Sequence, residues 1–114
     1  MIKGIRHIGL VVNDLEKSLL FWKNALGFTV NLVMEESGEH IDLMMGLKAV
    51  KLTTVKLSSP CETKIELLYF HSHPDKKMWK GTPFSTGLTH IALEVESIKD
   101  ILSVPPNTYE KLLK

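Results

Sequence analysis

The feature that most constrains the fold of this chain is an internal repeat. The stretch GIRHIGLVV, residues 4–12, returns 83 positions later as GLTHIALEV, residues 87–95. The identical positions keep one spacing and extend into the segment after each stretch: Gly4, His7, Ile8, Leu10, Val12 and Leu19 match Gly87, His90, Ile91, Leu93, Val95 and Leu102. Self-similarity at a fixed offset is typical of duplicated structural units. The repeat therefore predicts two related units, each opening with an apolar strand that carries a histidine.

The first copy predicts the element order β-α-β-β-β. Runs rich in β-branched residues or in alternating apolar residues indicate strands at residues 5–12, 28–34, 50–57 and 64–70. Between the first two strands, apolar residues recur at helical spacing, with Asn13 and Glu16 as the expected capping box and Gly27 as the expected helix end. The fold class expected from this order is α+β.

The remaining segments are less regular. Residues 35–49 predict a polar loop and a short helix that carries Leu43, Met44 and Leu47, and its methionines are expected to be core filler rather than a ligand surface. A second helix is expected near the end, capped by Asn107 after two prolines. The resulting division is a first βαβββ module at 1–75, a polar Pro- and Gly-containing linker at 76–86, and the start of a second module at 87–114.

Composition limits the cellular compartment and the classes of binding partner that are expected. A chain of 114 residues with a formal net charge of +1 is the size of one domain, and its charge indicates neither nucleic acid nor a membrane as a partner. Its apolar runs are too short to cross a bilayer, and its first residues lack the pattern of a signal peptide. The single cysteine, Cys61, next to Pro60, indicates a loop thiol without a catalytic role and a reducing cytoplasm.

The candidate site combines three residues. Glu66 is a carboxylate inside the most apolar strand, where a bare charge is costly unless it is paired, protonated or bound to a metal. His7 and His90 occupy equivalent positions of the repeat, so pairing of the two units brings both imidazoles to one place. Two imidazoles and a carboxylate suit a divalent transition metal with open positions for water or substrate. The pattern predicts a metal site at His7, Glu66 and His90.

Each of these residues also has a plainer interpretation. A lone histidine in a strand is often a satisfied core residue, and Glu66 on an edge strand can simply point to solvent. His71 and His73 in HSHP are a rival metal pair, because alternate residues of an extended chain share a face. Their polar surroundings favour a solvated pair, and His40 is likewise expected to be exposed.

The motifs of this chain resemble those of a known group of proteins. The β-α-β-β-β unit, its duplication, and the stretches HIGLVVNDLEKSLLFWKNALGF, KIELLYF and GLTHIALEV together resemble the vicinal-oxygen-chelate superfamily. That group includes glyoxalase I, methylmalonyl-CoA epimerase, extradiol dioxygenases, and fosfomycin- and bleomycin-resistance proteins. The resemblance covers residues 4 to about 102. It implies paired modules that form a half-barrel cup around a metal, and a homodimer.

Carried over by position, the resemblance assigns His7, Glu66 and His90 as metal ligands, with Glu66 also a candidate catalytic group. The glutamate in KIELLYF favours the glyoxalase I side, since the epimerase has glutamine there. Trp22 replaces the usual tyrosine, a change expected to affect only the core. A fourth ligand, the glutamate that often serves as base, is expected beyond Lys114, so the second module is expected to be incomplete in this chain, through truncation or disorder.

The function that the resemblance implies is that of a metal-dependent lyase or isomerase. Such an enzyme acts on a small substrate with vicinal oxygens through a metal-stabilised enediolate. Nickel, zinc, cobalt, manganese and iron all remain open as the metal, because one ligand set accepts several ions. Two alternatives stay open: a non-catalytic small-molecule-binding protein of the bleomycin-resistance type, and an iron-dependent extradiol-type dioxygenase.

Overall fold

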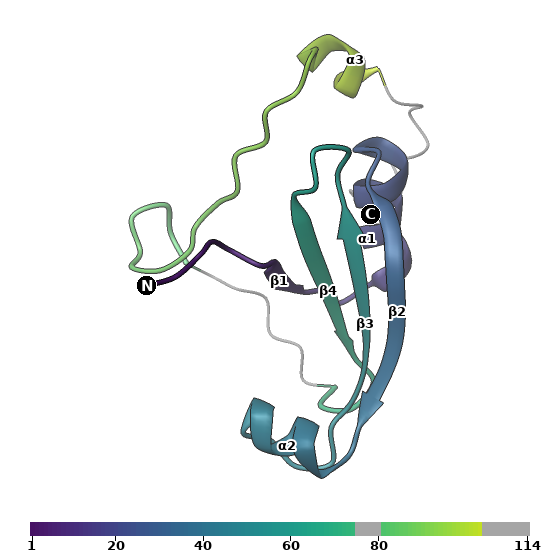
Figure 1. Cartoon of the computed structure of the whole chain (residues 1–114), viewed down its shortest axis with the longest axis vertical. Coiled ribbons are helices and arrows are strands. Elements are labelled where there is room, and N and C mark those ends of the chain that lie inside the picture. The colour runs from purple at the N-terminus through teal and green to yellow at the C-terminus, as the bar shows by residue number, and fades with distance from the viewer. Residues whose placement is uncertain (75–80, 104–114) are drawn as a thin grey trace.

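The first seventy residues contain all four strands of an open sheet (Figure 1). The computed structural model describes residues 1–74 and 81–103. Its strands are β1 (Ile8–Val11), β2 (Thr29–Ser37), β3 (Lys51–Ser58) and β4 (Lys64–Phe70), in the order β1-β4-β3-β2. Its helices are α1 (Leu15–Leu19), the π-helical η1 (Leu20–Ala25) that continues it, α2 (Glu39–Met45) and α3 (Ile98–Leu102). β1 and β4 are parallel and the other pairs antiparallel, which confirms the α+β class and the predicted β-α-β-β-β order.

The first helix begins one residue later than predicted. The N-cap is Asp14, whose backbone is extended and whose Oδ1 accepts a hydrogen bond from the Lys17 amide at 3.0 Å. Asn13 therefore lies outside the cap position, because a cap residue needs both that extended backbone and an acceptor facing the first turn. Gly27, with φ of +77°, ends the helical segment as predicted, and its amide donates to the Lys23 carbonyl at 3.1 Å.

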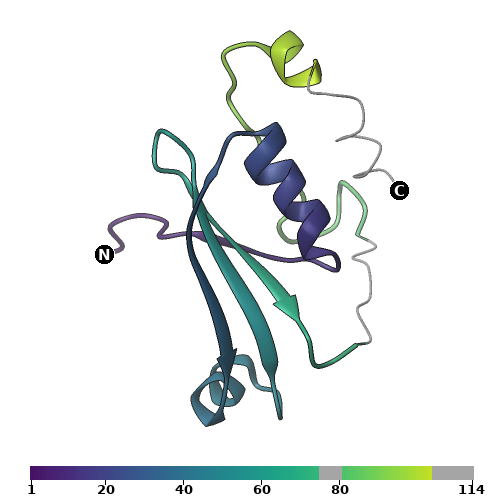
Figure 2. The ribbon, with the colours of Figure 1, turned by 90° about the vertical axis from the view of Figure 1, so that its right-hand side faces the viewer.

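The core lies between the first helical segment and one face of the sheet, called here the helix face (Figure 2). Trp22 and Phe28 pack edge to face, with ring centroids 5.1 Å apart. They cover a set of almost fully buried side chains on the two central strands: Val55, Leu57, Ile65 and Leu67. Trp22 is thus a core residue, as expected, and this cluster fixes the sheet on which the candidate site is built.

The opposite face of the sheet, called here the open face, is covered at one end by α2. Ile41 of that helix is buried against Val50 and Leu52, and Met45 packs on the same cluster. Met44 and Leu43, in contrast, are 72% and 76% exposed. The prediction that the methionines are core filler is therefore confirmed for Met45 and wrong for Met44, because α2 meets the sheet along the side that carries Ile41 and Met45. The rest of the open face carries the candidate site.

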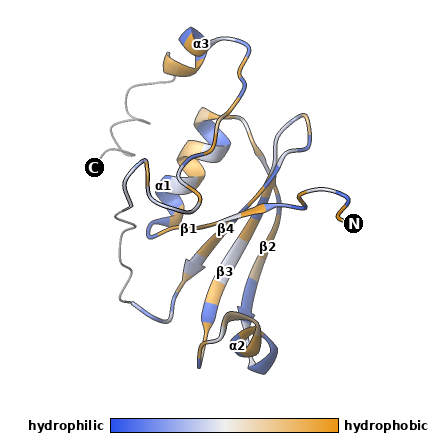
Figure 3. Cartoon of the chain, turned by 90° about the vertical axis from the view of Figure 1, so that its left-hand side faces the viewer, coloured by the Kyte–Doolittle hydropathy of each residue, from blue (hydrophilic) through white to orange (hydrophobic). Residues whose placement is uncertain are grey.

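The second copy of the repeat is folded only in part. α3 begins and ends 83 positions after α1, and Gly4 and Gly87 both have positive φ. Residues 88–95, however, form no strand within the described part of the chain, which contradicts the strand predicted for GLTHIALEV. The physical reason is that a strand needs a neighbour to pair its backbone groups, and the described residues place none beside this segment. α3 lies apart from the sheet (Figure 3).

Two predictions fall wholly or partly on residues that the structure does not describe. The helix expected after Asn107 and residues 76–80 of the linker lie outside the described residues, and the division into modules stays a prediction. Across residues 1–74 and 81–103, every helix is too short or too polar to traverse a lipid bilayer.

Candidate functional site

Glu66 and His7 meet on the open face. Glu66 lies in β4 opposite Gly9 of β1, and His7 precedes β1 by one residue on the same face as Gly9. The imidazole Nε2 of His7 is 3.9 Å from Oε1 of Glu66, and the two side chains are 38% and 15% exposed. Two of the three predicted site residues are therefore neighbours, and Glu66 points away from the core, as a largely covered carboxylate with a partner.

Glycine at position 9 makes room for this arrangement. A Cβ built at Gly9 would lie 3.3 Å from Cδ1 of Leu68, which is tighter than ordinary van der Waals contact. Because Gly9 has no side chain, no atom of β1 projects between His7 and Glu66. The Glu66 carboxylate can therefore be reached from the β1 side.

Lys56 is a site residue that the sequence analysis missed. It lies in β3 directly opposite Glu66, and its Nζ is 4.0 Å from Oε2 of that carboxylate. His7 and Lys56 thus approach different oxygens of the same group. Alternation along VKLTTVKL puts Lys56 on the open face, and the hairpin register between β3 and β4 was the additional knowledge needed to place it beside Glu66.

The third predicted residue, His90, does not join this pair. It is exposed in the segment before α3, and its Nδ1 is 2.9 Å from the hydroxyl of Thr89. Within residues 1–74 and 81–103, no three or more His, Cys, Asp or Glu side chains gather at one point as a metal site. His90 lies in the segment 88–95, which was expected to be a strand. Because this segment does not pair with the sheet, His90 is not brought to His7 and Glu66.

The imidazole of His7 and the carboxylate of Glu66 are donor types that bind divalent metals. Imidazole nitrogen and carboxylate oxygen bind zinc at about 2.0–2.2 Å, so two such donors on one tetrahedral ion lie about 3.4 Å apart. The observed separation of 3.9 Å is about half an ångström longer, so the two side chains would have to approach each other to share an ion. His7 lies near Oε1 of the carboxylate and Lys56 near Oε2. The structure thus contains two of the donors that such an ion needs.

The remaining histidines differ from one another. His40 is exposed, as expected, and His73 is exposed with Nδ1 2.8 Å from the Ser72 hydroxyl. His71 is exposed as well, as expected, but it also has partners: its Nε2 lies 2.6 Å from Oγ1 of Thr53 and 3.5 Å from Oε2 of Glu35. β4 ends at Phe70, so His71 is still close to the β3 side chains beside that strand. The HSHP pair therefore does not form one site.

The exposed thiol of Cys61 lies in the turn between β3 and β4, as expected. Its Sγ is 3.1 Å from the Ser59 hydroxyl and 3.7 Å from that of Thr63. These hydrogen bonds, the one from Ser59 first, lower the pKa of the thiol from its ordinary value. The side-chain partners of the thiol are thus Ser59 and Thr63 of the same turn, and neither belongs to the His7–Glu66 pair.

Comparison with known proteins places the fold. The model of the glyoxalase/bleomycin resistance protein/dioxygenase superfamily matches residues 4–104. The structure of a glyoxalase family protein from Bacillus cereus superposes with a TM-score of 0.80 at 20% identity, covering 90% of this chain and 70% of that one. The protein SMU.1112c superposes with a TM-score of 0.55 at 20% identity, covering 99% and 74%. These two likenesses concern the fold alone.

A curated relative gives the same result from sequence. The uncharacterized protein YwkD of Bacillus subtilis (strain 168) is 31% identical over 101 residues, a stretch that covers 86% of this chain and 66% of that protein. The chain thus spans slightly less than two thirds of the relative's length. The family match extends over nearly the whole sequence, including both histidines of the repeat and Glu66. The chain belongs to the glyoxalase/bleomycin resistance protein/dioxygenase superfamily.

Proposed function

We propose that this protein is a metal-dependent lyase or isomerase of the glyoxalase I type, acting on a small substrate with vicinal oxygens. The observation that carries the proposal is the His7–Glu66 pair on the open face, with Nε2 and Oε1 3.9 Å apart. His7 and Glu66 would hold the ion, and His90 would be the third ligand once its segment reaches the sheet. When bound, the ion would supply Lewis-acid stabilisation of negative charge on the substrate oxygens.

The protein's own residues have separate tasks in this proposal. Glu66 is the candidate group to accept and return a carbon-bound proton, since general-base catalysis needs a carboxylate within hydrogen-bond reach of that proton. Lys56 adds a positive charge beside the same carboxylate, where an anionic substrate oxygen would be attracted. Gly9 keeps the approach open between β1 and β4.

A homodimer and a cytoplasmic setting complete the proposal. The open face carries partly exposed apolar side chains, Val11, Leu32 and Met34, which a second copy of the chain would cover. The free Cys61 is compatible with a reducing compartment. Sedimentation equilibrium tests the first part: a dimer mass supports it, and a monomer at high concentration contradicts it.

Calorimetric titration with Ni²⁺, repeated with Zn²⁺, Co²⁺ and Mn²⁺, tests the metal site. The wild type should bind one equivalent of at least one of these ions. His7→Ala, Glu66→Gln and His90→Ala should each weaken binding at least about tenfold, since each removes a ligand. His40→Ala and His73→Ala remove exposed histidines elsewhere and should leave the affinity unchanged. A wild type that binds none of the ions, or control variants that lose as much affinity, would exclude the proposed site.

The metal-free binding protein is the second candidate, and one observation favours it. Lys56 already lies 4.0 Å from Glu66, so the carboxylate has a counter-charge without any metal. If no ion binds, His7 and the Lys56–Glu66 pair form a polar surface on the open face, on which a small molecule would be held by hydrogen bonds. The metal-dependent candidate then has its own activity test, a screen with glutathione and methylglyoxal in the presence of the bound ion. Turnover that is lost in Glu66→Gln supports the enzyme.

A further inference from the structure

The carboxylate of Glu66 lies between two nitrogen groups that approach it from opposite sides. β4 is flanked by β1 and β3, so His7 reaches the carboxylate from the β1 side and Lys56 reaches it from the β3 side. Nε2 of His7 is 3.9 Å from Oε1, whereas Nζ of Lys56 is 4.0 Å from Oε2. A movement of the carboxylate towards one of these groups is therefore a movement away from the other.

A shared metal ion would require such a movement. Two donors that bind one tetrahedral zinc ion lie about 3.4 Å apart, and the present separation of Nε2 and Oε1 is about half an ångström longer. Because the register pairs Glu66 with Gly9 on one side and with Lys56 on the other, the β1 side of the carboxylate is the side away from Lys56. An ion held by both donors therefore draws Glu66 towards β1 and parts it from Lys56.

Glu66 is the carboxylate directly opposite Lys56 in the sheet. Lys56 is paired with Glu66 of β4 on one side and with Leu32 of β2 on the other, so the β2 partner offers it no negative charge. The Lys56 side chain is 43% exposed and that of Glu66 only 15%, so the carboxylate is the partner that gains more from a counter-charge. At 4.0 Å the contact is longer than a hydrogen bond, so charge alone holds it and an incoming cation can replace it.

We propose that Lys56 is an internal competitor of the metal ion: it neutralises Glu66 in the metal-free protein and lowers the affinity of the site for a divalent ion, which must displace it. This inference rests on the proposed function, because it concerns the same site. A divalent ion and an ammonium group repel each other at such short range, so both cannot stay beside one carboxylate without a loss of affinity. The flexible four-carbon stem and the exposure of Lys56 let its ammonium group move aside. The released ammonium group is then free to attract an anionic oxygen of the substrate.

Calorimetric titration of the wild type and two Lys56 variants with Zn²⁺, and separately with Ni²⁺, tests this role. Lys56→Gln keeps a hydrogen-bond donor opposite Glu66 and removes the charge, so the dissociation constant of the ion should fall by at least about tenfold. Lys56→Arg keeps the charge and adds a forked donor that matches a carboxylate, so it should bind the ion no more tightly than the wild type. The expected order of affinity is therefore Lys56→Gln first, then the wild type, with Lys56→Arg equal to the wild type or weaker.

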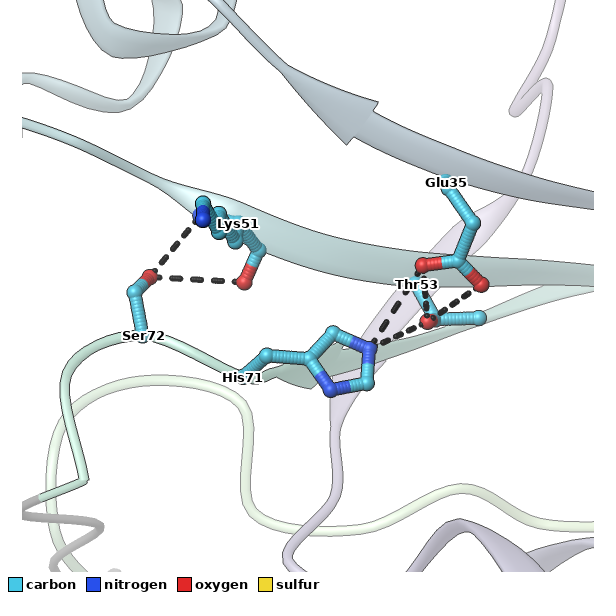
Figure 4. A network of polar contacts seen from close by, with 5 residues as sticks. All are labelled: Glu35, Lys51, Thr53, His71 and Ser72. Carbon is cyan, nitrogen blue, oxygen red and sulfur yellow. Dashed lines mark hydrogen bonds and ion pairs between the residues drawn. The ribbon is translucent and has the colours of Figure 1, made fainter.

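Lys51→Gln is the matched control. Lys51 lies at the start of the same strand, five positions before Lys56, and therefore on the opposite face of the sheet. Its position is fixed through its backbone, whose amide donates to the Ser72 hydroxyl at 2.9 Å (Figure 4). The variant removes the same charge from the protein at a distance from Glu66, so the dissociation constant should change by less than about twofold.

The contrary results separate this role from the proposed function. If the wild type binds an ion and Lys56→Gln binds it equally or more weakly, Lys56 positions Glu66 for the ion instead of competing with it, and only the present inference is overturned. A gain for Lys51→Gln equal to that for Lys56→Gln also overturns it, because the effect would then come from net charge. If neither the wild type nor Lys56→Gln binds Zn²⁺ or Ni²⁺, the competitor role and the metal site fail together.

Discussion

Residues 4–19 and 87–102 are two copies of one sequence pattern in two structural states. In the first copy, β1 pairs with β4 and places Ile8 and Leu10 against the core, and α1 follows from an Asp14 cap. In the second copy, α3 follows from a Ser97 cap at the equivalent position, but the segment before it forms no strand within the described residues. Local signals therefore reproduce the helix in both copies, whereas the strand depends on a partner.

The difference shows which part of a fold is local. A capped turn satisfies its backbone groups within a few residues, so Ser97 accepts from the Asp100 amide at 3.1 Å much as Asp14 accepts from Lys17. A strand satisfies its groups only across to another strand, and β1 finds β4 some sixty residues away in sequence. Ile8 and Leu10 thus pack against the core in the first copy, whereas their counterparts Ile91 and Leu93 are each 40% exposed.

The largest expected effect comes from truncating an apolar side chain in each half. Leu67→Ala removes a side chain that is 0% exposed and should lower the free energy of unfolding by about 2–5 kcal/mol, through lost burial and a cavity. Leu88→Ala removes an exposed one and should change it by no more than about 0.5 kcal/mol. Urea denaturation followed by circular dichroism measures both. A cost for Leu88→Ala close to that of Leu67→Ala would mean that the second copy is packed.

The two helix caps give a smaller and closer contrast. Asp14→Ala should cost about 1 kcal/mol, because α1 leads into the helical segment that carries the buried Trp22. Ser97→Ala removes an equivalent hydrogen bond from a helix without buried residues, so global unfolding should change by only a few tenths of a kcal/mol. The same denaturation measurement applies. Equal losses for the two variants would contradict the independence of α3 from the core.

The smallest effect concerns Cys61, in the ordered turn between β3 and β4. Hydrogen bonds from Ser59 and then Thr63 lower the pKa of its thiol, so a larger thiolate fraction is present near neutral pH than for an unperturbed cysteine. Ser59→Ala should raise the pKa and slow alkylation by iodoacetamide at pH 7.5 by a few-fold. The rate as a function of pH measures this shift. An unchanged profile in Ser59→Ala, matched by the urea-unfolded protein, would show that the turn does not fix these hydroxyls.

The sequence was sufficient to predict the parts that depend on local pattern or on the repeat. Strand and helix order followed from periodicity, and Glu66 was singled out because a carboxylate in KIELLYF needs a partner. The partners themselves, His7 and Lys56, depend on register between strands distant in sequence, of which only His7 was anticipated. The polar stretch HSHP was sufficient to predict that His71 is exposed, but nothing in it indicates the contact with the Thr53 hydroxyl.

Hydrogen–deuterium exchange of the metal-free wild type tests the central claim most directly. If one sequence pattern is a paired strand in the first copy and an unpaired segment in the second, the amides of β4 and its neighbour β3 should exchange at least about a thousandfold more slowly than those of residues 88–95. Fast exchange throughout 88–95, next to slow exchange in 65–70, is the predicted result. Protection of residues 88–95 equal to that of β4 would contradict the account, since it would require a partner strand for the second copy.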